Sequence, residues 1–227
     1  MCFSATASFV AGGSLSAIGV ATIMKVEHRA ELPFAAIPLL FGVQQLVEGV
    51  LWVTFGHDAP MLQRTMIYAY SMFSHVLWPL YVPFAFRFLE TTPWRRRAML
   101  WFQAAGLAVG LYLFYMLVTR PIVADVSGGH VVYVSPHFYT VPVMALYLAS
   151  TCVVGFLSSH TFVRLFGLLA FVSFVATYLV ASRALVSVWC FFAAILSLLI
   201  YLHLRYRHFG GFPKHDPLIA RRPETAE

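Results

Sequence analysis

Two ionisable side chains, Glu48 and His75, lie deep inside long apolar stretches of the sequence. An ionised group at the middle of a membrane-spanning helix costs about 2.5–3.5 kcal/mol on insertion scales, so such residues usually serve a function. A carboxylate beside an imidazole can relay protons, hold a metal ion or bind a polar group of a ligand. The structural alternative is a buried pair that only fixes the packing of two helices.

Other polar and aromatic residues recur near Glu48 and His75 at helical spacing, so they share a helix face with them. Counting about 1.5 Å per residue along two antiparallel helices places Glu48 and His75 within about one helical turn of the same depth. We therefore expect the two to meet in one pocket that opens outward. The other residues predicted to line this pocket are Gln44, Gln45, Trp52, Tyr68, Ser71, Trp78, Tyr178 and Cys190.

A metal ion and haem are the cofactors that the sequence leaves open. The candidate metal ligands are His75, Glu48 and Cys2, whose amine and thiol become a chelating pair if the initiator methionine is removed. His75 is the sole histidine well inside an apolar stretch, so it would ligate haem alone. A retinal Schiff base is excluded, because Lys25 and Lys214 lie outside the apolar stretches.

Ser71 and His75 form an S-x-x-x-H spacing. It resembles the first motif of the seven-helix, zinc-dependent membrane hydrolases that include alkaline ceramidases and adiponectin-type receptors. Those proteins also carry an H-x-x-x-H on the last helix, whereas His203 and His208 here are five residues apart. A shared zinc site is therefore not expected.

Composition places the whole chain in a membrane. Hydrophobic residues make up 60% of its 227 residues, charged residues 11%, and the mean hydropathy is +0.79. One membrane-spanning helix needs about 20 apolar residues. We predict an all-α protein with seven transmembrane helices, near residues 6–24, 32–55, 65–89, 98–119, 139–158, 165–183 and 184–204. The turn at Arg183 has no Gly or Pro to mark it, so the last two stretches could also be one interrupted helix.

The distribution of basic residues predicts the orientation. With the N-terminus outside and the C-terminus inside, twelve of the fifteen Lys and Arg lie on the cytoplasmic side, as the positive-inside rule requires. These charges form no patch interleaved with aromatics, so we expect membrane lipid and no nucleic acid as partner. The bacterial inner membrane is the expected location.

Residues 1–208 are predicted to form the membrane domain, and residues 209–227 a weakly ordered cytoplasmic tail. In the outer loop 122–134, two β-rich runs flank Gly128 and Gly129, which predicts a small β-hairpin. His57, His130 and His137 lie on the outer side, where they could help to close a site above His75, although solvated loop histidines are far commoner.

Four segments carry a resemblance over nearly the full length: "MCFSATASF" at the start, "FGVQQLVEGVLW" (41–52), "SHVLWPLYVPF" (74–84) and "VWCFFAAILSLLIYLH" (188–203). Together they resemble an uncharacterised family of bacterial multi-helix membrane proteins. The resemblance implies membrane topology and bacterial origin, and it carries over no catalytic residue.

Three functions follow as expectations. The first is binding of a small ligand or metal ion in the Glu48/His75 pocket, with catalysis left open. The second is a proton-coupled transporter or proton relay, and the third a structural or accessory membrane subunit. The sequence does not decide whether the protein is an enzyme, nor its oligomeric state.

Overall fold

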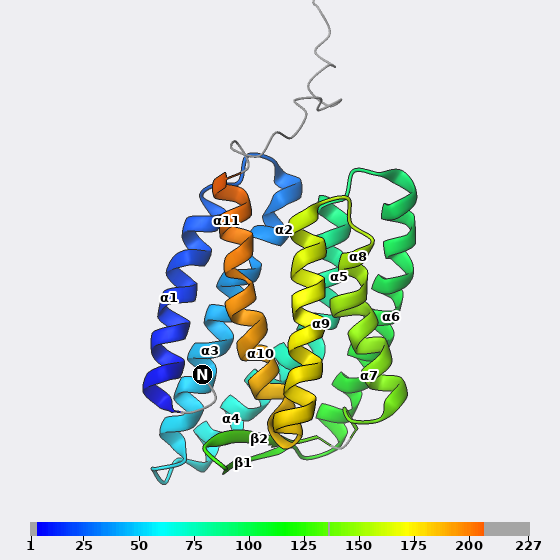
Figure 1. The fold of residues 1–227 in the computed structure, drawn as a ribbon. Helices are drawn as coiled ribbons and strands as arrows, with labels where there is room; N and C mark the ends of the chain where they lie inside the picture. Colours follow the sequence, from blue (N-terminus) through cyan, green and yellow to red (C-terminus); the bar gives the residue numbers. More distant parts are fainter. Residues whose placement is uncertain (1–3, 136, 207–227) are drawn as a thin grey trace, which may run out of the picture.

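Helices form almost all of the protein in a computed structural model, which describes residues 4–135 and 137–206 (Figure 1). The predicted tail, 209–227, and Cys2 lie outside the described residues. The elements are α1 (Ala5–Ile23), η1 (Arg29–Glu31), α2 (Leu32–Ala35), α3 (Ile37–Thr54), α4 (Pro60–Ser71), η2 (Met72–Leu77), α5 (Trp78–Leu89), α6 (Pro93–Thr119), β1 (Val123–Ser127), β2 (His130–Val134), α7 (Val141–Leu148), η3 (Ala149–Val153), α8 (Val154–Phe156), α9 (Thr161–Ala181), η4 (Ser182–Ala184), α10 (Leu185–Leu196) and α11 (Leu198–Tyr206).

Proline marks the start of many of these helices. Its fixed φ suits the first helical turn, and its missing N–H is not needed there. The first or second position is proline in α2 (Pro33), α3 (Pro38), α4 (Pro60), α5 (Pro79), α6 (Pro93) and α7 (Pro142).

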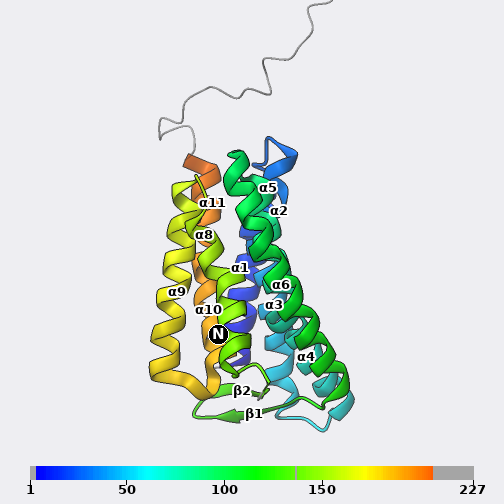
Figure 2. The ribbon, with the colours of Figure 1, turned by 90° about the vertical axis from the view of Figure 1, so that its right-hand side faces the viewer.

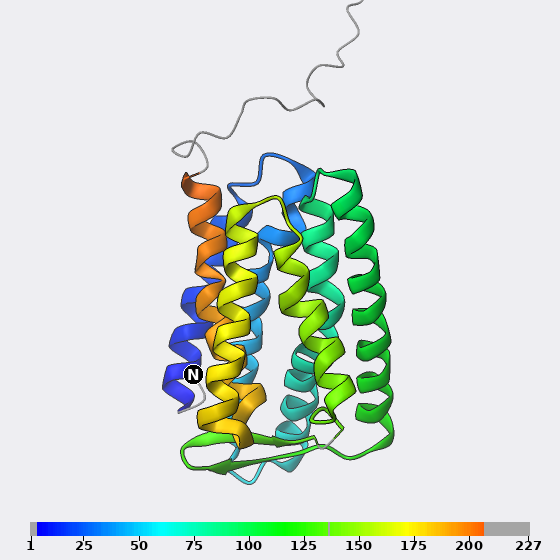
Figure 3. The ribbon, with the colours of Figure 1, turned by 45° about the vertical axis from the view of Figure 1, so that its right-hand side comes forward.

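The long helices stand side by side with their axes roughly aligned, so the connections gather at two ends of the molecule (Figures 1 and 3). The hairpin end carries residues 55–59, the strands β1 and β2, and η4. The opposite end carries residues 24–31, 90–92 and 157–160. Figure 2 shows the same division from the side.

Within the described residues, four helical stretches are long and apolar enough to cross a membrane: Ala5–Ile23, Arg29–Thr54, Pro93–Thr119 and Thr161–Tyr206. Val141–Phe156 is a shorter apolar helix. Exposed apolar side chains cover the outer faces of α6 and α9, where water would be a poor solvent and lipid a good one. They include Leu107, Leu111, Phe114 and Val118 of α6, and Leu168, Val172, Leu179 and Val180 of α9.

Small residues bring two pairs of helices into close contact. A Cβ atom on Gly19 of α1 would lie 2.4 Å from the Leu39 nitrogen of α3, and one on Gly106 of α6 would lie 1.9 Å from the Pro79 carbonyl oxygen of α5. The G-x-x-x-G of Gly106 and Gly110 therefore packs within this chain, against residues 76–80.

The predicted β-hairpin is confirmed. β1 and β2 pair antiparallel, from Val123 opposite Val134 to Ser127 opposite His130. Gly128 and Gly129 have φ of 59° and 78°, the left-handed conformation that both central residues of a type I′ turn require. Tyr133 of β2 stacks on Tyr70 of α4, with ring centroids 4.5 Å apart, so the hairpin packs against the helix ends.

The short 3₁₀ turn η4 reverses the chain between α9 and α10, which run antiparallel beside each other (Figures 1 and 3). The stretch around Arg183 is therefore a turn between two helices.

Candidate functional site

A π-helical turn, η2, places His75 inside the protein. The N–H of Trp78, at its end, donates to the Phe73 carbonyl, five residues back. Pro79 follows directly and offers no N–H to the fourth residue before it, which favours a local change in the hydrogen-bond register. Single π turns of this kind are frequent at functional sites. His75 is 1% exposed.

His75 lines a cavity of about 260 Å³ at the hairpin end, which we call the hairpin pocket. Its walls are the last turns of α6, the segment that leads into β1, and the segment that leaves β2. Apolar side chains form one part of the lining and hydrogen-bonding or cationic groups form the other. The lining residues are His75, Leu113, Met116, Leu117, Arg120, Pro121, Ile122, Val134, Ser135 and His137.

Hydrogen bonds hold both nitrogens of the His75 imidazole. Nδ1 lies 2.8 Å from Ser74 Oγ, and Nε2 lies 3.0 Å from Ser135 Oγ. The ring also packs against Phe138, with centroids 5.1 Å apart. The Tyr147 hydroxyl donates to the Ser74 carbonyl and ties η2 to α7. The imidazole therefore has a defined orientation in the pocket.

Glu48 belongs to a different polar cluster, formed by α3, α5 and α10. It is fully buried, and its Oε1 accepts a hydrogen bond of 2.5 Å from the Ser187 hydroxyl. One turn away, Gln44 Oε1 accepts from Trp78 Nε1 at 2.7 Å. The Cys190 thiol has Gln44 as a polar neighbour. The cluster is closed and joins three helices, as interhelical polar contacts do in membrane proteins.

The single pocket around Glu48 and His75 that the helical spacing predicts is not what the geometry shows. Among residues 4–135 and 137–206, neither hydrogen bond of the His75 ring goes to Glu48, and Glu48 does not line the hairpin pocket. Equal depth along two antiparallel helices does not by itself bring two side chains together. They meet only if each helix also turns the face that carries the residue towards the other helix. Both side chains are buried, but with different partners.

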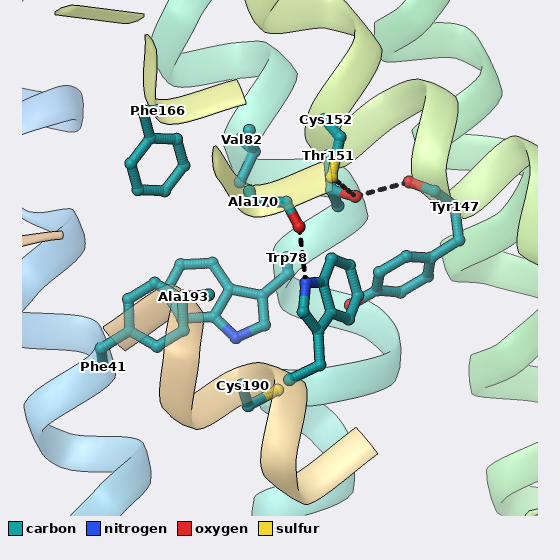
Figure 4. A pocket seen from close by; sticks show the side chains of 11 residues that line it. Phe41, Trp78, Val82, Tyr147, Thr151, Cys152, Phe166, Ala170, Cys190 and Ala193 are labelled. Atoms are coloured by element: carbon teal, nitrogen blue, oxygen red, sulfur yellow. Dashed lines mark hydrogen bonds between the residues drawn. The ribbon is translucent and has the colours of Figure 1, made fainter. Parts of the chain in front are cut away.

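A small aromatic cavity of about 30 Å³ is lined by residues of α3, α5, α9 and α10, among others (Figure 4). Trp78 stacks on Phe41 at 3.9 Å, and the cavity is also lined by Trp189, whose Nε1 donates to the Ala170 carbonyl at 3.0 Å. The thiols of Cys152 and Cys190 border the cavity from different helices (Figure 4). Its volume holds roughly one or two water molecules and no larger ligand.

The remaining predicted residues lie in several places. Tyr178 is 49% exposed and stacks on Phe174, away from both polar sites. Tyr68 lies under the Arg64 guanidinium, 5.7 Å from it. Trp52 packs edge-on against Phe55. Gln45 and Ser71 are fully buried, beside Gln44 in α3 and at the end of α4.

A metal centre finds no support in the part of the chain that the structure describes, where no three His, Cys, Asp or Glu side chains lie close enough to hold an ion. Sequence reasoning missed Arg120, Ser135 and Ser187 as contributors to polar sites. The predicted hairpin could have indicated Arg120 and Ser135, because pairing of its two strands brings the residues before β1 and after β2 close together.

A third polar site lies at the opposite end. Glu90 accepts hydrogen bonds from the Thr92 N–H at 2.9 Å, and from the N–H and hydroxyl of Ser159 at 2.7 and 2.8 Å. Burial raises the pKa of this carboxyl group, but the hydrogen bonds from Ser159 and Thr92 outweigh it, so the net pKa lies below 4.5. Glu90 thus fastens the connection between α5 and α6 to the connection between α8 and α9.

These features define a helical protein with helices long and apolar enough to cross a membrane and with a mixed polar and apolar pocket under a β-hairpin. The chain belongs to DUF6629, a family of unknown function, whose model matches residues 1–213. The predicted membership of an uncharacterised family is thereby confirmed. No curated protein and no solved structure matches the chain.

Proposed function

We propose that the protein is an integral membrane protein of the bacterial inner membrane that crosses the bilayer seven times, with its N-terminus and the hairpin end outside. The crossings are α1, α2–α3, α4–α5, α6, α7–α8, α9 and α10–α11. The charges support this orientation. Of the described Lys and Arg, Arg64, Arg120 and Arg183 lie at the hairpin end, and Lys25, Arg29, Arg87, Arg95, Arg96, Arg97, Arg164 and Arg205 lie towards the opposite end.

Reporter fusions test this orientation. A periplasm-active phosphatase fused after residue 58 or in the hairpin turn should be active, and one fused after residue 92 or 159 should be inactive. The reverse pattern would refute the proposed orientation, and equal activity at residues 58 and 92 would refute the crossing between them.

The hairpin pocket is proposed to bind a small amphiphile with an acidic head, such as a carboxylate or phosphate. The observation that carries this proposal is the lining, which includes the cationic residue Arg120 and also His137, and has no carboxylate among the described residues. An anion gains charge-assisted hydrogen bonds there. Leu113, Met116, Leu117, Ile122 and Val134 would contact an apolar chain. A volume of about 260 Å³ suits a small ligand.

A set of eight-carbon probes tests the charge preference. In a neutral maltoside detergent, octanoate should raise the thermal unfolding temperature, whereas octanol and octylammonium should have much smaller effects. At 100 times its Kd, a ligand of the native state stabilises it by about 2.7 kcal/mol. Equal stabilisation by octanol and octanoate would refute the proposal.

Two arginine variants locate the binding site. Arg120→Gln should abolish most of the octanoate effect because it removes the guanidinium from the pocket. Arg64→Gln is the matched control: Arg64 lies at the same end of the molecule, but its guanidinium lies over Tyr68 and does not line the pocket. If both variants respond to octanoate as the wild type does, the ligand binds elsewhere.

A further inference from the structure

Ser135 and His75, which line the hairpin pocket, form a continuous hydrogen-bonded series with Ser74. Ser135 Oγ is 3.0 Å from Nε2 of His75, whose Nδ1 is 2.8 Å from Ser74 Oγ. A nucleophile within hydrogen-bonding reach of a base, which a third group orients, is the arrangement that activates a serine hydroxyl. Ser135 and His75 both line the pocket, so a bound molecule would meet them.

The direction of the hydrogen bonds favours Ser135 as the nucleophile. The Ser74 hydroxyl donates to the Ser71 carbonyl at 3.5 Å, so its oxygen is left to accept a hydrogen bond from the Nδ1–H of His75. Nε2 is then the unprotonated nitrogen and accepts from the Ser135 hydroxyl. In this tautomer the unprotonated Nε2 of His75 faces the Ser135 hydroxyl.

The surroundings hold this geometry in place. His75 is 1% exposed and packs against Phe138, while Ser74 is fixed through its carbonyl, which accepts from the Tyr147 hydroxyl. Ser135 directly follows Val134, the last residue of β2, so the paired strands set its position. The other two members, Ser74 and His75, lie in the π turn η2, close to Pro79.

We propose that Ser135, His75 and Ser74 form a catalytic centre that hydrolyses carboxylic esters with a short or medium acyl chain. This inference rests on the proposed binding function, because the acid that the pocket binds would be the product. Arg120 lines the same pocket and brings a fixed positive charge to it. A fixed positive charge favours the oxyanion that forms when the ester carbonyl is attacked, and it also favours the ionised form of the product acid.

The reaction proceeds in two balanced steps. Ser135 Oγ attacks the carbonyl carbon of the ester, and its proton passes to His75 Nε2; the bond to the alcohol oxygen then breaks, and the alcohol leaves with that proton. A water molecule next attacks the acyl group on Ser135 and gives a proton to Nε2. The bond to Ser135 Oγ breaks, the hydroxyl recovers the proton, and the carboxylic acid leaves. Ser74 is a positioning residue that holds the imidazole.

A fluorophosphonate probe and p-nitrophenyl octanoate test this centre with the full-length protein in maltoside detergent. The wild type should be labelled on the peptide that contains Ser135 and should hydrolyse the ester. Ser135→Ala should lose the label and at least about 10³-fold in hydrolysis. Ser127→Ala, a serine on the other strand of the same hairpin, should behave as the wild type.

Two further variants separate catalysis from folding. His75→Gln should lose labelling, and an unchanged unfolding temperature would exclude misfolding as the reason. Ser74→Ala should lower kcat with little change in KM, which a purely structural role would not produce. An unlabelled wild type that still binds octanoate would overturn the catalytic centre and leave the binding function standing. Labelling at Ser135 without octanoate binding would support catalysis and refute the acidic-ligand proposal.

Discussion

The close contact between α6 and α5 makes Gly106→Ala the most informative single substitution. A Cβ atom at this position would lie 1.9 Å from the Pro79 carbonyl oxygen, 2.9 Å from the Pro79 carbonyl carbon and 3.2 Å from Ser150 Cβ. The first two atoms belong to the backbone, so no rotamer change relieves the overlap. The two helices must separate, by more than 1 Å if an ordinary contact of about 3.5 Å is to be restored.

The magnitude follows from two opposing effects. Overpacking in a tight core costs about 1–3 kcal/mol and occasionally more, and a clash with backbone belongs at the upper end of that range. The better helix propensity of alanine returns about 0.5–1 kcal/mol. We expect Gly106→Ala to lower the free energy of unfolding by about 2 kcal/mol. For a chain of this length that corresponds to a Tm lower by about 4–8 °C.

Gly13→Ala is the matched control, because a Cβ atom there meets no heavy atom within 4 Å. This glycine lies inside the helix α1, so alanine should leave Tm unchanged or raise it slightly. Thermal scans of tryptophan fluorescence in detergent measure both variants, since Trp78 and Trp189 are buried. Equal Tm values for the two variants would refute the tight α5–α6 contact.

The same substitution reports on the site. α6 carries Leu113, Met116 and Leu117 of the hairpin pocket, and α5 follows directly on the turn that carries His75. Separation of α5 and α6 should therefore also weaken octanoate binding. Loss of stability with full octanoate affinity would show that the pocket does not depend on this contact.

Three other predictions concern the remaining polar groups and the hairpin. Because the folded pKa of Glu90 is lowered, its contribution to stability is fully present above the unfolded pKa and is lost as pH falls through the folded value below 4.5. Glu90→Gln should therefore lower Tm at pH 7 and flatten the decline of Tm below about pH 4.5. Asp58→Asn, in an exposed loop, should do neither. Ser187→Ala removes the hydrogen bond to buried Glu48 and should cost about 1–3 kcal/mol, and an unchanged octanoate shift would verify that this cluster is separate from the pocket. Gly128→Val should destabilise the hairpin by about 1–2 kcal/mol, because φ is 59° there; circular dichroism melts together with octanoate titration would detect the loss, and an unaffected pocket would contradict the role of the hairpin in shaping it.

Some features of this protein follow from residue type and local spacing alone. The apolar composition is sufficient for the helical class. Gly128 and Gly129 are sufficient for the hairpin, because a two-residue turn with positive φ favours glycine strongly over other residues. The burial of Glu48 and His75 also follows from their position in apolar stretches.

The partners of these buried groups were decided by the tertiary structure. His75 meets Ser135, 60 residues away, and Glu48 meets Ser187, 139 residues away. Helical periodicity indicates which residues share a face of a helix. The rotation of each helix about its axis decides which neighbour that face meets. Here small residues such as Gly106 and the π turn at His75 set this rotation. Two residues expected at one depth therefore belong to two sites, since the Glu48 side chain faces α10 and the His75 side chain faces the end of β2.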